Sequence, residues 1–264
     1  MLNTNISVLI TSKCTLNCEF CSSGIPYHTK QRHIPVEEVV LQVKQALDIY
    51  KNAGVYVTHL DLLGGEPLLH PELLDIIRGV YQYRDMFHEL RILTNGTLIP
   101  DETLLKGIQK LDQTMKVFFI VSNYGQLSAR FDRICALLEE RGINYRVDEY
   151  SGDDQYFGGW VSYGQDGIVQ GTTEARFRGC AFCHSGVAEI FDGKLFPCVR
   201  TLALHTTGRE VLPEDEYIVL QDSLEINTKK LSSFMKREVP FSCCEHCTGL
   251  NKSAKRYPAA RQVL

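Results

Sequence analysis

The chain has 264 residues, of which 44% are hydrophobic and 23% are charged, and its net charge is −4. This is the balance of a folded globular protein, and the absence of a long basic run argues against a nucleic-acid partner. No apolar stretch approaches the roughly 20 residues that cross a bilayer, and residues 1–5 lack the features of a signal peptide. We therefore expect a cytoplasmic protein with no membrane partner.

The first half of the chain alternates between strand-like and helix-like segments. Apolar runs predict strands, and the amphipathic stretches between them predict helices. Such alternation is typical of βα units with parallel strands and right-handed crossovers. The pattern is compatible with a doubly wound open sheet or a barrel. Five or six units are too few for a closed barrel of about 250 residues, so an α/β partial barrel fits better than a full one. The predicted strands are 6–11, 56–63, 89–94, 117–122 and 145–150, and the predicted helices are 35–53, 71–83, 101–111 and 127–142.

Three cysteines follow the first predicted strand directly. Cys14, Cys18 and Cys21 have the spacing C-x3-C-x2-C, and Phe20 precedes the last of them. A loop with this spacing can hold one corner of a four-iron cluster, which normally takes four thiolates, and leave the fourth iron open. A zinc knuckle is the alternative, although structural zinc sites usually have a complete set of four ligands.

Residues 11–21 resemble the signature of the radical S-adenosylmethionine (radical SAM) enzymes. The resemblance implies a [4Fe-4S] cluster whose open iron binds SAM and a 5′-deoxyadenosyl radical that abstracts a hydrogen atom from substrate. It also implies a partial (β/α)6 TIM-like barrel with the cluster loop after the first strand, and an external one-electron reductant such as flavodoxin or ferredoxin.

Several residues at strand ends are expected to contact SAM. The Gly-Gly-Glu turn after the second strand matches the family motif that binds the SAM amino group, and Phe20 matches the aromatic residue near adenine. Small polar side chains that end the third and fourth strands could hydrogen-bond the ribose or the carboxylate. Each has a structural alternative, as a strand-to-helix turn, as loop packing or as a turn residue. The predicted SAM-binding residues are Phe20, Gly64, Gly65, Glu66, Asn95, Ser122 and Asn123.

The regular alternation ends near Ser151. We expect a radical SAM core over residues 1–151, a junction and barrel end over 152–179, and a cysteine-rich segment over 180–264. Within the last segment, residues 187–196 have the pattern of a hairpin, with Asp192 and Gly193 supplying the positive φ that a tight turn needs.

Ten cysteines without an export signal favour metal ligands over disulfides. Cys135 lies in a predicted helix and is expected to be a buried core thiol. Six others follow the core, and their two C-x2-C pairs would suit zinc. However, the G-x4-C run at 193–198 resembles the SPASM extension, whose shortened "twitch" form holds one auxiliary [4Fe-4S] cluster. The candidate ligands are Cys180, Cys198, Cys244 and Cys247, a set similar to the spacing in twitch-bearing aminocyclitol dehydrogenase, with Cys183 and then Cys243 as substitutes.

Three functions are compatible with these motifs. The first is an oxidoreductase that dehydrogenates a small polar substrate, a sugar- or aminocyclitol-like alcohol, and passes an electron to the auxiliary cluster. The second is a maturase that crosslinks or epimerises a ribosomal peptide; we expect no leader-binding domain before Cys14, an objection that a separate leader-binding protein would remove. The third is a non-enzymatic electron-transfer or zinc-scaffold protein, which leaves the Gly-Gly-Glu turn unexplained. No general base can be chosen among Tyr27, His28, Arg146, Asp148 and Glu149.

Overall fold

One mixed sheet of eight strands organises the protein. The computed structural model describes residues 4–111, 116–151, 160, 162, 171–182, 186–250 and 257–263. Within them the strand order is β5-β4-β3-β2-β1-β6-β7-β8. The strands are β1 (Thr4–Thr11), β2 (Val57–Gly64), β3 (Phe87–Thr94), β4 (Lys116–Asn123), β5 (Asn144–Glu149), β6 (Ala188–Phe191), β7 (Lys194–Phe196) and β8 (Ile218–Val219).

Six of these strands are parallel. β1 to β5 pair in chain order, as expected when each βα unit returns beside the previous strand. β6 pairs with the free edge of β1, with Ile6 opposite Ala188 and Val8 opposite Ile190. The prediction of an α/β fold with a mostly parallel, unclosed sheet is thus confirmed. The sixth parallel strand lies next to β1, on the side away from β5.

The predicted hairpin is present and extends this same sheet. β6 and β7 are antiparallel, with Ile190 opposite Leu195, and β8 continues the sheet beyond them. Asp192 has φ 53° and Gly193 has φ 75°, so both turn residues adopt the left-handed conformation that such a tight turn requires. The cysteine-rich segment is therefore joined to the core through backbone hydrogen bonds.

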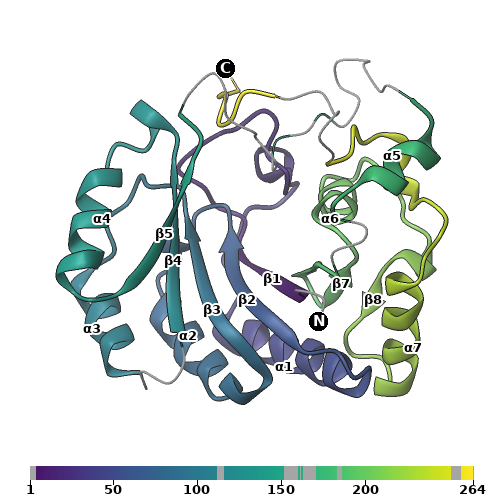
Figure 1. The fold of residues 1–264 in the computed structure, drawn as a ribbon, viewed down its shortest axis with the longest axis horizontal. Coiled ribbons are helices and arrows are strands. Elements are labelled where there is room, and N and C mark those ends of the chain that lie inside the picture. The colour runs from purple at the N-terminus through teal and green to yellow at the C-terminus, as the bar shows by residue number, and fades with distance from the viewer. Residues whose placement is uncertain are drawn as a thin grey trace.

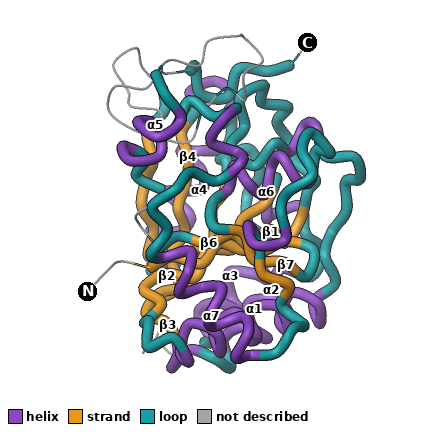
Figure 2. Tube along the Cα trace, turned by 90° about the vertical axis from the view of Figure 1, so that its right-hand side faces the viewer, coloured by secondary structure: helices purple, strands orange, loops and turns teal. Residues whose placement is uncertain are grey.

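Helices cover the outer face of the sheet. Figure 1 shows α1 to α4 outside β1 to β5, and Figure 2 shows α1, α2, α3 and α7 together on one side of the strands. The predicted helix over 127–142 is shorter, because residues 125–127 form a separate 3-10 turn before it. No helix in the described ranges is long and apolar enough to cross a membrane. The helices are α1 (Val36–Asn52), α2 (Leu73–Tyr81), α3 (Glu102–Lys110), α4 (Phe131–Glu140), α5 (Thr173–Gly179), α6 (Val199–Thr206) and α7 (Leu224–Met235).

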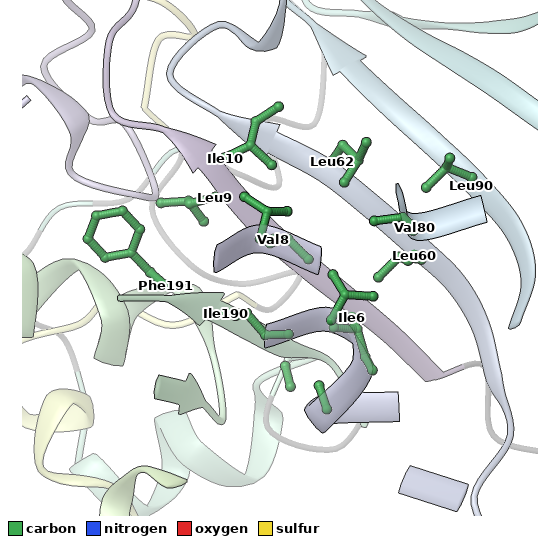
Figure 3. Packing of buried hydrophobic residues seen from close by; sticks show 14 of the residues in the cluster. Ile6, Val8, Leu9, Ile10, Leu60, Leu62, Val80, Leu90, Ile190 and Phe191 are labelled. Atoms are coloured by element: carbon green, nitrogen blue, oxygen red, sulfur yellow. The ribbon is translucent and has the colours of Figure 1, made fainter. Parts of the chain in front are cut away.

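The hydrophobic core is centred on β1. Ile6, Val8 and Ile10 are at most 1% exposed, and they pack among apolar side chains of the neighbouring strands and of α2 (Figure 3). Burying one such side chain stabilises the fold by about 1.5–3 kcal/mol. Cys135, expected in the core, is half-buried on α4 and packs against the edge of this cluster.

The parallel strands point toward one end of the sheet. Figure 1 shows the loop that follows β1 at this end, together with the segment near the C-terminus. Ligands of parallel α/β sheets bind at the carboxyl ends of the strands, so this end is the place to look for a site.

Candidate active site

The Gly-Gly-Glu turn after β2 is in direct contact with the cysteine loop. The Gly65 amide donates to the Thr11 carbonyl at 2.8 Å, and the Glu66 amide donates to the Lys13 carbonyl at 2.8 Å. A Cβ atom on Gly64 would lie 2.1 Å from the Thr11 oxygen, and one on Gly65 would lie 2.0 Å from the Lys13 oxygen. Both glycines are therefore required for the close approach of two backbones.

Glu66 links the ends of β2 and β3. Its carboxylate is fully buried, and it accepts hydrogen bonds from the Leu68 amide at 3.0 Å, the Thr94 hydroxyl at 2.9 Å and the Asn95 amide at 2.7 Å. Burial raises the pKa of Glu66 to about 7, and the three donors act in the opposite direction. In this structure both carboxylate oxygens are occupied by donors from the protein itself.

The three cysteines of the loop lie in a largely buried site. Cys18 is buried, and Cys14 and Cys21 are half-buried. The side-chain amides of Asn95 and Gln262 donate to the sulfurs of Cys14 and Cys18, at 3.6 and 3.5 Å. Burial raises the pKa of Cys14 to about 11 and that of Cys18 to about 12, so ionised thiolates here need a positive partner. Cysteine sulfurs that lie in one loop and accept hydrogen bonds from N–H groups are suited to be ligands of an iron–sulfur cluster.

Asn95 serves as a turn residue and as a link to the cysteine loop. Its side-chain oxygen accepts from the Thr97 amide at 3.1 Å, and its side-chain nitrogen donates to the Thr15 hydroxyl at 2.9 Å. The structure therefore places this predicted residue beside Cys14.

Ser122 and Asn123 lie at the end of the next strand. The Ser122 carbonyl accepts from the Ser128 hydroxyl at 3.0 Å. The Asn123 side chain donates to Glu149 at 2.8 Å and accepts from the Gly125 amide at 2.9 Å. These contacts fix the loops after β4 and β5, and a role of either residue toward SAM stays a prediction.

A segment that the sequence did not indicate covers the cysteine loop. Residues 257–263 run antiparallel to it at Cys18 and Gln262, and the Val263 amide donates to the Asn17 carbonyl at 2.7 Å. Phe20 is 4% exposed, with the Tyr257 ring centroid 4.4 Å from its own. Packing against Tyr257 thus accounts for the burial of Phe20, and a contact between Phe20 and the adenine of SAM stays a prediction.

Three aromatic side chains pack together beside Cys18 and Phe20. Tyr124 stacks on Tyr150 at 5.1 Å between ring centroids and meets the edge of Trp160 at 5.7 Å. The three belong to the same apolar cluster as Cys18 and Phe20. In the sequence, Tyr124 follows the predicted strand 117–122, Tyr150 ends the predicted strand 145–150, and Trp160 lies in the predicted junction, so no motif joined the three.

Comparison with known proteins identifies the family. The model of the radical SAM superfamily matches residues 8–145, more than half of the chain. The chain belongs to the radical SAM superfamily. Its cofactors are therefore SAM and a [4Fe-4S] cluster, as this family uses.

Related proteins match this chain over different shares of its length. GTP 3′,8-cyclase of Limosilactobacillus fermentum is 28% identical over 122 residues, 44% of this chain and 35% of its own. The enzyme of the same name from Campylobacter jejuni serotype O:6 is 33% identical over 98 residues, 36% of this chain and 28% of its own. This chain thus matches only about a third of their length. The solved structure of BtrN, in complex with AdoMet and 2-DOIA, covers 98% of both chains with a TM-score of 0.57 and 15% identity.

Beyond the radical SAM match, a cavity brings the later cysteines together. All four preferred candidates line it, and Cys243 does so as well. The remaining candidate, Cys183, lies outside the described residues. Within those residues, no three His, Cys, Asp or Glu side chains are arranged to hold a single metal ion. The cavity itself identifies this second candidate site.

Two structural features fix the thiols around this cavity. Cys198 is the N-cap of α6, and the Thr201 hydroxyl lies 3.2 Å from the sulfurs of both Cys198 and Cys243. The pKa of Cys198 is lowered, first by a hydrogen bond from Cys243 and also by Thr201. Arg176, which is 8% exposed, donates to the Cys244 carbonyl at 2.8 Å. Such contacts hold the loop at Cys243 and Cys244 against the helix.

The candidate bases of the radical SAM site have structural partners. His28 Nε2 lies 2.9 Å from the Ser23 carbonyl oxygen, and the Tyr27 hydroxyl donates to the Glu19 carbonyl at 3.2 Å. Two others, Arg146 and Asp148, form an ion pair with each other, and Glu149 accepts from Asn123. The geometry does not single out one of them as a base.

Proposed function

We propose that this radical SAM enzyme is an oxidoreductase that dehydrogenates a small sugar- or aminocyclitol-like alcohol. Cys14, Cys18 and Cys21 would hold the [4Fe-4S] cluster with its open iron. The observation that carries the proposal is the second cavity, where five cysteines converge on one side of a radical SAM core. When bound, SAM and the reduced cluster supply the 5′-deoxyadenosyl radical that takes a hydrogen atom from substrate.

The turn after β2 would orient SAM. Since the Glu66 carboxylate is occupied by three donors, the backbone carbonyls of Gly64 and Gly65 are the groups we propose for the methionyl amino group. Asn95 contacts the cysteine loop at Cys14 and Thr15 and would contact SAM there, with Ser122 and Asn123 at the end of the next strand. The rings of Tyr124, Tyr150 and Trp160 would line the SAM pocket on the side of β4 and β5.

The second cavity would hold an auxiliary [4Fe-4S] cluster on Cys180, Cys198, Cys244 and Cys247. Loss of a hydrogen atom from the H–C–OH carbon leaves a carbon radical beside a hydroxyl. Formation of the carbonyl then releases one proton and one electron, and the auxiliary cluster would accept that electron. An external one-electron reductant such as flavodoxin or ferredoxin would supply the electron that starts the reaction.

The choice of substrate rests on how much of the chain each similarity covers. BtrN, whose structure holds 2-DOIA, matches over 98% of both chains, which favours a substrate of similar size. The cyclases act on GTP by name but match only about a third of their own length. GTP is therefore the second substrate to test, and a ribosomal peptide is the third.

The first experiment tests radical chemistry and substrate together. The chain is reconstituted anaerobically with iron and sulfide and reduced with dithionite, and 5′-deoxyadenosine and methionine are measured with SAM. We expect both products from the wild type and neither from Cys18→Ala. A cyclic aminoalcohol should increase 5′-deoxyadenosine and yield one equivalent of ketone, whereas increased turnover with GTP alone would reject the proposed substrate class.

Iron analysis tests the second site separately. We expect about eight irons per wild-type chain and about four in Cys198→Ala, since each four-iron cluster normally needs its four ligands. Cys243→Ala should keep about eight. Wild-type protein with only four irons and no loss in Cys198→Ala would reject the auxiliary cluster.

A further inference from the structure

Helix α6 contacts the loops of both cysteine sites. It begins at Val199, directly after its N-cap Cys198, and its eight residues extend about 12 Å. Near its other end the Thr206 hydroxyl lies 3.0 Å from Nε2 of His28, in the loop of the first three cysteines. Gly24 of that loop also packs on the helix, because a Cβ atom there would lie 3.3 Å from the Ala203 Cβ. The two sites are thus joined by one short, rigid element.

Arg200 lies in the first turn of this helix and carries a buried charge. Its residue is 3% exposed, it lines the cavity with Cys198 and Cys247, and its guanidinium carbon is 4.8 Å from the Phe182 ring centroid. The described lining contains Arg200, Arg176 and five cysteines but no carboxylate. Outside the lining, the pKa of the buried Glu189 is raised by burial and lowered by the charge of Arg200, so this carboxyl group is also within its reach. A buried cation is costly unless negative charge is close by.

The charge of Arg200 acts on both sites. Burial raises the pKa of Cys247 to about 11 and also raises that of Cys21, and the guanidinium opposes burial in both cases. Arg176, the other arginine of the lining, donates to backbone carbonyls at Gly171 and Cys244. Arg176 therefore holds the loop at Cys244, and the charge of Arg200 acts on thiols of both cysteine sites.

We propose that Arg200 raises the reduction potential of the cluster in the second cavity and so makes that cluster a better electron acceptor. This inference rests on the proposed function. One-electron reduction adds one negative charge to the cluster, and a fixed positive charge at the wall of a buried cavity stabilises the reduced form more than the oxidised form.

The test isolates the second cluster in the complete chain. A Cys18→Ala background removes the first cluster, and the reduced fraction is followed by electron paramagnetic resonance at fixed potentials with redox mediators. We expect Arg200→Gln to lower the ratio of reduced to oxidised cluster at least tenfold, which is about 59 mV for a one-electron couple. Arg200→Lys keeps the charge and should stay within about threefold of the parent.

Two further variants make the result decisive. Arg200→Met is a second neutral change that keeps an apolar stem over Phe182, and Arg176→Gln is a matched control that removes a buried charge from the same lining. We expect Arg176→Gln to lower the iron content, because Arg176 holds the loop at Cys244, and to lower the ratio of reduced to oxidised cluster less than Arg200→Gln does.

Each failure has a separate meaning. If either neutral variant binds iron and keeps the parental ratio of reduced to oxidised cluster, the proposed role of Arg200 is wrong. Failure of both neutral variants to bind iron also overturns it, because Arg200 would then be needed for assembly. Absence of iron from the Cys18→Ala parent would instead reject the second cluster, and with it the proposed function.

Discussion

The contact between the Gly-Gly-Glu turn and the cysteine loop leads to a quantitative prediction for Gly65→Ala. The added Cβ would lie 2.0 Å from the Lys13 oxygen and 2.9 Å from the Cys14 Cβ. Real contacts of a Cβ are at least 3.0 Å, so the Lys13 carbonyl must move by about 1 Å. That movement breaks or weakens the two backbone hydrogen bonds of 2.8 Å between the turn and the loop.

The expected cost follows from these contacts. Two hydrogen bonds contribute about 2 kcal/mol, and overpacking adds about 1–3 kcal/mol. We therefore expect Gly65→Ala to lower the free energy of unfolding by about 3–5 kcal/mol, and to lower the iron content because Cys14 moves with Lys13. Urea unfolding followed by circular dichroism, together with iron analysis, measures both effects.

A matched control separates close backbone contact from the general effect of replacing glycine. A Cβ on Gly107 would also meet a neighbour, at 2.4 Å, but this neighbour is the Leu74 Cδ1 at the end of a flexible side chain. Alanine also favours the α3 helix by up to about 1 kcal/mol. Gly107→Ala should change the stability by less than about 1 kcal/mol. Equal stability and iron content in Gly65→Ala and Gly107→Ala would refute the reasoning.

Three further predictions concern other residues of the site and core. Burial raises the pKa of Glu189 to about 8, so its contribution to stability is present below about pH 4.5 and lost as the pH rises through about 8. The wild type should lose about 3 kcal/mol more unfolding free energy than Glu189→Gln between about pH 5 and pH 8. Urea unfolding at several pH values measures this, and the same pH dependence in both proteins would contradict the prediction. Tyr257→Ala exposes Phe20 and should make the visible absorbance of the cluster bleach several-fold faster in air, whereas the exposed Tyr56→Ala should not; equal rates would count against the covering role. Cys135→Ala, at a half-buried thiol on α4, should leave iron content unchanged, and a loss of iron would make that thiol a ligand.

Local pattern was sufficient for the core of the fold. The strand at Ile6–Thr11 and the helices after it were predictable because burial on one face imposes a period on each segment. The turn at Asp192 and Gly193 was predictable from its need for positive φ. The partner of β6 was not predictable, because a strand of four buried residues carries no signal for a partner about 180 residues away.

The candidate site was predictable only where residue type and spacing carry the chemistry. The cysteine loop and the turn at Gly64 and Gly65 have such patterns, and the structure brings them into contact. Residues 257–263 have no motif, and the burial of Arg200 depends on packing of distant elements. An arginine or glutamine in a sequence does not reveal that it will face a sulfur.

The pairing of Cys18 with Gln262 also has a consequence for the timing of cofactor insertion. These residues are 244 positions apart in the chain. At a synthesis rate of about 5–20 residues per second, the cysteine loop leaves the ribosome roughly 10–50 s before the segment that covers it. During that interval its thiols are open to oxidants and to unwanted metal ions. If iron and sulfide enter before residues 257–263 pack onto the cysteine loop, this segment closes over a cluster that is already in place.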